Sequence, residues 1–187
     1  MSDAAEPEAG ADPGERGERI AKWLARAGVA SRRDAERMLA EGRVALNNVR
    51  LTHPASFVVP GDIVQVDGKV VDSPDRTRLW RYHKPAGLVT THRDPEGRPT
   101  VFDKLRSQLP RVISVGRLDL TSEGLLLLTN DGGLARRLEL PATGWVRRYR
   151  VRVNGQPDPQ ALAGLSRGVT IDGIRYGSID ANIERRT

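Results

Sequence analysis

The sequence contains no cysteine, which excludes a disulfide framework and any thiolate metal site. Its three histidines, His53, His83 and His92, are too scattered to resemble a metal-binding cluster. Long hydrophobic runs are also missing, since the longest is the four leucines at residues 125–128. No leader with a charged start and an apolar core is recognisable, so we expect a cytoplasmic protein that does not bind a membrane.

Charge is distributed unevenly along the chain. Residues 1–15 carry five acidic groups and no Lys or Arg, so the net charge of +6 for the whole chain becomes +11 for the rest. Nearly all of the basic residues are arginines, whose planar guanidinium makes bidentate contacts to phosphate. This composition favours a polyanionic partner such as nucleic acid, although many basic proteins are merely soluble.

A first folded unit is predicted at residues 18–72, after an acidic tail at residues 1–17 whose composition is typical of disorder. Residues 20–27 have the apolar spacing of a helix, and Ser31 is the expected cap of a second one. The segment 44–51 is a predicted hairpin, because Asn47 and Asn48 tolerate the positive φ angles of a tight turn. With a further strand at 63–67, these elements form a helix–helix–hairpin unit.

Exposed basic residues gather on the two predicted helices of this unit. A solvated helix face is the usual meaning of such a run. The alternative is a phosphate-docking face, because several of the arginines surround the helix junction and the first amides of the second helix would add to it. The candidate RNA-binding residues are Lys22, Arg26, Arg32, Arg33 and Arg37, and Arg43 is exposed beside them.

A polar linker at residues 73–78 is predicted to separate this unit from a second one at residues 79–187. Strands are expected at 79–83, 112–115 and 145–153, a central strand at 125–129, and two strands at 169–171 and 174–175 on either side of an Asp172-Gly173 turn. Helices are expected at about 100–108, at 132–139 and after Asp158. In 145–153 arginines alternate with apolar residues, which predicts that Tyr149 faces inward. Strands dominate this half, so the predicted fold class is α+β with a mixed, mainly antiparallel sheet.

Asp119 is the acidic residue to examine for chemistry. It lies in a polar loop between two apolar strands and close to Arg117, where a carboxylate stays ionised and can act as a nucleophile or a base. The alternative is a structural aspartate that caps a turn by accepting hydrogen bonds from the amides of Thr121 or Ser122. For an arbitrary loop aspartate, the capping role is the more common one.

Three blocks of the sequence resemble the RsuA/RluB group of pseudouridine synthases, in the order that the family has them. They are "YHKPAGLVTTHRDPEGRPTVFD" at 82–103, "VGRLDLTSEGLLLLTNDG" at 115–132 and "RRYRVRVNGQ" at 147–156. Residues 19–43, the hairpin and "VVPGDIVQVDGKVV" at 58–71 are similar to the S4 RNA-binding domain. The resemblance implies site-specific isomerisation of uridine to pseudouridine in ribosomal RNA, without a cofactor or metal. "DPEGRPTVFD" at 94–103 is similar to the branch that modifies the large subunit, which implies 23S rather than 16S RNA.

The resemblance also implies roles for single residues. Asp119 matches the nucleophile, Tyr149 matches the tyrosine that stacks on the target base and assists proton transfer, and Arg117 matches the arginine that holds the flipped nucleotide. The alternatives are a core tyrosine at 149 and, at 117, an ion pair that only orients Asp119. Lys84 is a candidate phosphate contact, or residues 84–87 are a turn that shapes the loop.

Relative to the family pattern, the sequence stops at residues 183–187, before a basic block that normally adds a cation near the aspartate and further strand pairing. We therefore expect the C-terminal part of the synthase domain to be missing. The expected partner is ribosomal RNA or a large-subunit assembly intermediate, bound by a monomer. The competing hypothesis is a non-catalytic RNA-binding or ribosome-assembly protein that uses Asp119 structurally.

Overall fold

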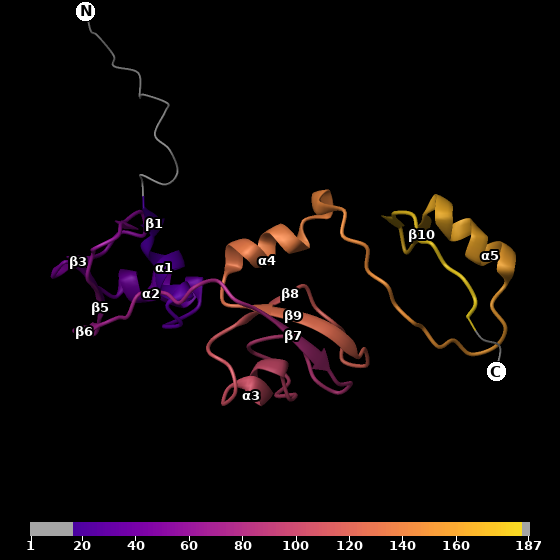
Figure 1. Cartoon of the computed structure of the whole chain (residues 1–187), viewed down its shortest axis with the longest axis horizontal. Coiled ribbons are helices and arrows are strands. Elements are labelled where there is room, and N and C mark those ends of the chain that lie inside the picture. Colours follow the sequence, from indigo (N-terminus) through magenta and orange to yellow (C-terminus); the bar gives the residue numbers. More distant parts are fainter. Residues whose placement is uncertain (1–16, 185–187) are drawn as a thin grey trace, which may run out of the picture. The chain divides into compact units, whose positions relative to one another are not determined.

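The structure is a computed structural model that describes residues 17–184. The predicted acidic tail, apart from Gly17, lies outside the described residues. The chain divides into two units, residues 1–145 and 146–187 (Figure 1). Among the residues that the structure describes, no helix is long and apolar enough to cross a bilayer.

The first unit begins with two helices, α1 (Ile20–Arg26) and α2 (Arg32–Ala40). Ser31 caps α2 as predicted: its Oγ accepts a hydrogen bond from the Asp34 amide at 3.1 Å and donates one to the Asp34 carboxylate at 2.7 Å. The buried faces of both helices belong to one apolar core, which also includes Val44, Val58 and Val64 from the strands beside them. Helical periodicity was sufficient to predict this pair.

A four-stranded antiparallel sheet with the order β3-β2-β5-β6 completes this region, and β1 pairs with β4 beside it. Asn47 and Asn48 have φ angles of 50° and 65°, so the predicted tight turn between β2 and β3 is confirmed. The strands are β1 (Glu18–Arg19), β2 (Val44–Leu46), β3 (Val49–Leu51), β4 (Phe57–Val58), β5 (Val64–Val66) and β6 (Lys69–Val70).

A second sheet follows in the same unit, with the order β7-β9-β8 and both pairings antiparallel. Its strands are β7 (Leu79–Lys84), β8 (Ile113–Val115) and β9 (Gly124–Thr129). The leucine run of β9 is central, as predicted, because a strand paired on both sides favours apolar residues. Every pairing between the described strands is antiparallel, which confirms the α+β class with a mainly antiparallel sheet.

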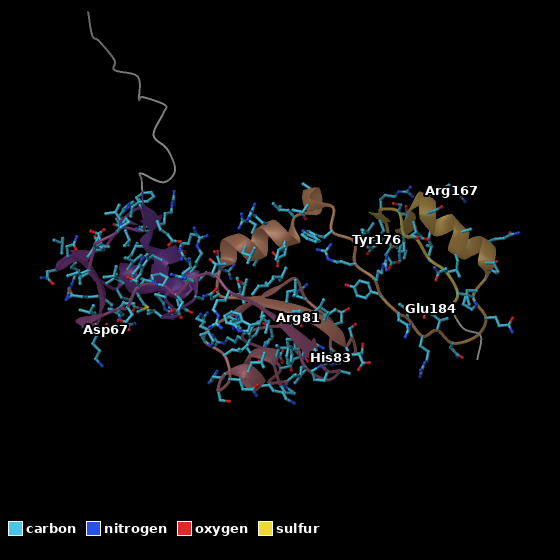
Figure 2. The ribbon with its side chains drawn as sticks, in the orientation of Figure 1. Asp67, Arg81, His83, Arg167, Tyr176 and Glu184 are labelled. Carbon is cyan, nitrogen blue, oxygen red and sulfur yellow. The ribbon has the colours of Figure 1, made fainter. Side chains whose placement is uncertain are left out.

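Helices cover both faces of this sheet. On one face Leu126 and Leu128 pack with Val101 and Leu105 of α3 (Val101–Leu105). On the other face α4 (Gly132–Glu139) packs on β8 and β9, and Figure 1 shows the two helices on opposite sides. Strand alternation places Arg81 and His83 on the α4 face of β7, where both are exposed (Figure 2), and Lys84 on the α3 face. A short 3-10 helix, η1 (Pro141–Thr143), follows α4.

The second unit contains α5 (Pro159–Gly164), the 3-10 helix η2 (Leu165–Arg167) and a hairpin of β10 (Val169–Ile171) and β11 (Ile174–Tyr176). The prediction of a strand at 145–153 is wrong for this structure, because these residues have no regular secondary structure. Alternating side chains are not enough, since a strand also needs a neighbour for its backbone hydrogen bonds, and no described strand pairs with this segment. Tyr149, predicted to face inward, is 65% exposed.

Asp131 connects the start of α4 to the segment that precedes β7. Its carboxylate accepts hydrogen bonds from the Gly133 and Leu134 amides at 2.7 and 3.3 Å and from the Thr77 hydroxyl at 2.7 Å. Burial raises the pKa of Asp131, but these hydrogen bonds outweigh it and hold the pKa below its ordinary value. Folding therefore favours the ionised carboxylate, whose contribution to stability is present at neutral pH and lost as the pH falls through the lowered pKa.

We predict that Asp131→Ala lowers the free energy of unfolding at pH 7 by about 1–2 kcal/mol, because it removes a helix cap and leaves Thr77 without its acceptor. Urea denaturation followed by circular dichroism measures this. The deficit should begin to shrink below about pH 4, the ordinary pKa of an aspartate in the unfolded chain, and should disappear as the pH falls through the lowered pKa of folded Asp131. Asp75→Ala, which removes an exposed acid in the preceding segment, is the control. Equal stability of the two variants would contradict the role of Asp131 as the cap of α4.

Candidate active site

Asp119 lies in the loop between β8 and β9. Leu118 packs against the core under the α3 face, while its neighbours Arg117 and Asp119 are exposed. The Leu118 side chain therefore anchors this part of the loop in the core, and the charged side chains of Arg117 and Asp119 lie on either side of it. This arrangement fixes the loop at its middle and leaves both charged side chains accessible.

Lys84, at the end of β7, holds the second half of this loop. Its side chain is 0% exposed, and its ammonium donates to the backbone carbonyls of Pro85 at 3.1 Å, Asp119 at 2.9 Å and Ser122 at 2.7 Å. An ammonium has three N–H groups, so all of its donors are used. The pairing of β7 with β9 explains the position, because Lys84 lies opposite Gly124, the first residue after the loop.

Two residues of the segment that follows Lys84, Thr90 and Gly87, also bind the loop. The Thr90 hydroxyl donates to the carbonyl oxygen of Leu118 at 2.8 Å and accepts from the Leu118 amide at 3.4 Å. The Gly87 amide donates to the carbonyl oxygen of Leu120 at 2.7 Å. Gly87 has a φ of 86°, which favours glycine at the turn after Lys84. The backbone on both sides of Asp119 is thus hydrogen-bonded to a segment that comes well before it in the sequence.

Glu139 of α4 is the fourth residue that binds the loop. The Gly116 amide donates to the carboxylate of Glu139 at 2.7 Å. The sequence patterns identified neither Glu139 nor Thr90 as part of the site. Glu139 had a detectable signal, since an acidic residue at the C-terminal end of a predicted helix opposes the helix dipole. A threonine inside an apolar segment gives no comparable signal.

The Asp119 side chain, in contrast to its backbone, is free. Across residues 17–184 its carboxylate accepts no hydrogen bond and forms no ion pair, and no cluster of His, Asp or Glu could hold a metal ion. The Ser122 amide does close a turn, but it donates to the backbone carbonyl of Asp119 at 3.1 Å and not to the carboxylate. Arg117 forms no ion pair with Asp119 either. Neither structural alternative that the sequence left open for these two residues is realised in this part of the chain.

The buried ammonium of Lys84 and the carboxylate of Asp119 interact electrostatically. Burial lowers the pKa of Lys84, while the charge of Asp119 partly offsets that effect. The sequence left two roles open for Lys84, a phosphate contact and a turn that shapes the loop. With its three donors bound to carbonyl groups, the ammonium has none left for a phosphate. The geometry therefore favours the loop-shaping role.

Tyr149, the third residue of the predicted catalytic set, belongs to the second unit. It lies in the irregular segment after Trp145 and is 65% exposed. Beside it, Arg150 Nε donates to the carboxylate of Glu184 at 2.8 Å, and Glu184 is labelled in Figure 2. The structure thus brings Asp119, Arg117 and Lys84 together in one loop region, and it leaves the relation of Tyr149 to them undefined.

The basic residues of the predicted docking face and its surroundings fall into two groups. Four of them form ion pairs: Lys22 and Arg26 with Glu18, Arg37 with Asp34 and Glu41, and Arg43 with Asp67 and Glu41. Figure 2 labels Asp67 among these acids. Arg32 and Arg33, in the first turn of α2, are exposed and form no ion pair with any residue in the range 17–184. These two arginines are the members of the predicted docking face that keep their full charge available.

We predict that Lys84→Met, which keeps the length of the side chain but removes its three donors, lowers the free energy of unfolding by about 2–4 kcal/mol. Up to three carbonyl groups lose their partner, and each unsatisfied buried acceptor costs about 1–3 kcal/mol before the loop rehydrates. Urea denaturation measures the change. Lys104→Met, which replaces an exposed lysine of α3, is the control. If the Lys84→Met protein is as stable as this control, Lys84 does not hold the loop.

Comparison with known proteins shows which families this sequence matches. A family model described as RNA pseudouridylate synthase matches residues 78–184, and a model of the S4 domain matches residues 18–64. An uncharacterized RNA pseudouridine synthase of Rickettsia bellii is 48% identical over 169 residues, which cover 90% of this chain and 73% of the relative. One of Rickettsia felis is also 48% identical, over 85% of this chain and 69% of its own length.

Relatives with a more specific name match over a smaller share of their length. The ribosomal large subunit pseudouridine synthase B of Haemophilus influenzae is 43% identical over 166 residues, which cover 86% of this chain but 46% of the relative. The chain therefore spans about half the length of that protein. The synthase model covers more than half of the chain, and the S4 model covers the region before it. This chain belongs to the RNA pseudouridine synthase family, a family of isomerases, and carries an N-terminal S4 RNA-binding domain.

Proposed function

We propose that this protein isomerises a specific uridine to pseudouridine in the ribosomal RNA of the large subunit, with Asp119 as the nucleophile. The observation that carries the proposal is the contrast between the backbone and the side chain of Asp119. Lys84, Thr90 and Gly87 hold the backbone from residue 118 to residue 122, whereas the carboxylate is exposed and has no partner among the described residues. A fixed position combined with a free reactive group is what a nucleophile requires.

The reaction itself explains why so few groups are needed. The bond from the ribose carbon C1′ to the base nitrogen N1 breaks, a bond from C1′ to carbon C5 forms, and the proton leaves C5 while N1 gains one. All of the atoms belong to one nucleotide, so the reaction needs no redox carrier or ATP. The larger requirement is to extract the base from its stack, at a cost of a few kcal/mol. Binding energy from a separate docking domain can supply part of that cost.

Two further residues complete the proposed catalytic set. Arg117 is exposed two residues before Asp119 and has no ion pair among the described residues, so its guanidinium is available to hold the flipped nucleotide. Tyr149 is exposed, and its ring is suited to stacking on the target base and its hydroxyl to proton transfer. Both assignments rest on the motif positions of these residues.

The choice of ribosomal RNA rests on the named relatives. Proteins called ribosomal large subunit pseudouridine synthase B are 43% identical to this chain, whereas the more similar Rickettsia proteins are named without a substrate. We propose residues 18–72 as the docking domain, 73–78 as the linker and 79–187 as the synthase domain of a cytoplasmic monomer. Modification of 16S RNA and RNA binding without catalysis are the alternatives, and mapping of the modified sites distinguishes them.

We predict that a chromosomal Asp119→Asn substitution abolishes one pseudouridine of the 23S RNA and lowers the modification rate in vitro by about a thousandfold or more. Affinity for the RNA should stay within a few-fold, because the amide keeps the size of the carboxylate. Mapping of pseudouridines on both ribosomal RNAs of the source cells provides the measurement. Glu123→Gln, an isosteric change in the same loop, is the control and should leave the map intact.

Different results of this mapping separate the alternatives. Loss of a site in 16S RNA would correct the substrate. An unchanged map in cells that carry Asp119→Asn would reject the nucleophile. An unchanged map in cells that lack the protein would favour the non-catalytic hypothesis.

We also predict that Arg32→Ala combined with Arg33→Ala weakens RNA binding and lowers the slope of log affinity against log salt by about two, one for each phosphate that is no longer neutralised. The matched control is Arg50→Ala with Lys69→Ala, which removes two charges from the edge strands β3 and β6 of the same domain. Affinity is measured at several salt concentrations between about 50 and 200 mM. If both double variants change the slope equally, the first turn of α2 is not the docking face.

A further inference from the structure

Glu139 is in an unfavourable place for a structural glutamate. It is the last residue of α4, and the C-terminal end of a helix favours cations, as in the preceding Arg136 and Arg137. Although these arginines are close in sequence, Glu139 forms no ion pair within residues 17–184. Its carboxylate instead accepts a hydrogen bond from the Gly116 amide, at 2.7 Å. Glu139 thus opposes the dipole of its own helix and hydrogen-bonds to a loop that is distant in the sequence. It is therefore a candidate for a role in that loop.

Gly116 is the point where the chain leaves β8 for the Asp119 loop. The pairing of β8 with β9 ends at Val115, and Gly116 has a φ of 70°, a left-handed conformation that turns the chain sharply. Lys84, Thr90 and Gly87 hold only residues 118–122. Within the described residues, Glu139 is therefore the group that holds the entrance of the loop, next to Arg117.

We propose that Glu139 is a positioning residue for catalysis: its carboxylate fixes the Gly116 amide and thereby sets where the next residue, Arg117, presents its guanidinium. The inference rests on the proposed function, in which Arg117 holds the flipped nucleotide for the nucleophile Asp119. An isolated turn at Gly116 has freedom in two dihedral angles, and rotation there displaces every atom that follows until Leu118 reaches the core. A displacement of about 1 Å in a group that holds the substrate can cost about a hundredfold in rate.

The helix dipole makes this proposal distinguishable from a purely structural role. If Glu139 were an ordinary helix-end acid, its removal would leave the rate unchanged and, by relieving the dipole, would leave stability unchanged or raise it. A positioning role predicts the same behaviour of stability but a lower rate. The rate and the stability of one variant therefore separate the two interpretations.

The experiment compares Glu139→Ala, Glu139→Gln, Asp119→Asn and the control Arg137→Ala, an exposed residue of the same helix turn, in the full-length protein expressed from its gene. Single-turnover pseudouridine formation on large-subunit ribosomal RNA gives the rate constant and the protein concentration for half-maximal rate. We expect about a tenfold fall in the rate constant for Glu139→Ala, with half-saturation and unfolding midpoint unchanged. Glu139→Gln should stay within about twofold of wild type, because its amide oxygen still accepts the Gly116 hydrogen bond.

A second readout follows the Gly116 hydrogen bond itself. The Gly116 amide proton should exchange with solvent faster in Glu139→Ala than in wild type, and Glu139→Gln should restore its protection. A Glu139→Ala rate within twofold of wild type, or a fall in rate that Gln does not restore, overturns the positioning role while leaving Asp119 in place. A fall in rate that parallels a lower unfolding midpoint overturns it too. If Asp119→Asn remains active, the proposed nucleophile fails, and the role of Glu139 fails with it.

Discussion

The buried ammonium of Lys84 is the interaction on which the site depends. A lysine in an apolar interior is unstable unless each of its donors finds an acceptor, and here the acceptors are the carbonyl groups of Pro85, Asp119 and Ser122. The end of β7 is thereby joined to both sides of the turn that carries Asp119. The pairing of β7 with β9 places Lys84 opposite Gly124, at the end of the Asp119 loop. The register of this pairing therefore also sets the position of the Asp119 backbone.

The same division between bound backbone and free side chain runs through the site. Leu118 enters the core, Thr90 and Gly87 bind the backbone, and the charged groups of Arg117 and Asp119 remain exposed. Because the loop is fixed through its backbone, the side chains of Arg117 and Asp119 remain available for the proposed chemistry. The S4 domain shows a related pattern, since most basic residues of its helices are neutralised by neighbouring acids, whereas the pair at the start of α2 has no acidic partner within residues 17–184.

The segment around Tyr149 is where sequence pattern and structure differ most. Alternation at 145–153 predicted a strand, yet the structure has an irregular, exposed chain there. The hairpins at Asn47 and at Asp172 succeeded because each contains its own partner strand a few residues away. A segment that has no partner strand can show the same alternation of side chains but lacks the backbone hydrogen bonds of a strand, and the sequence pattern alone does not distinguish the two cases.

Features that depend on near neighbours in the sequence were determined by the sequence alone. The Ser31 cap, the Asn47 turn and the central leucine strand each follow from residues within a few positions, and the ordered motif blocks predict Asp119 as the nucleophile. Tertiary structure decided the rest: that Lys84 points inward, that Glu139 reaches Gly116, and that the Asp119 carboxylate stays free within the described part of the chain. These contacts join residues 23 to 38 positions apart, so they exist only once strand register and helix packing are set.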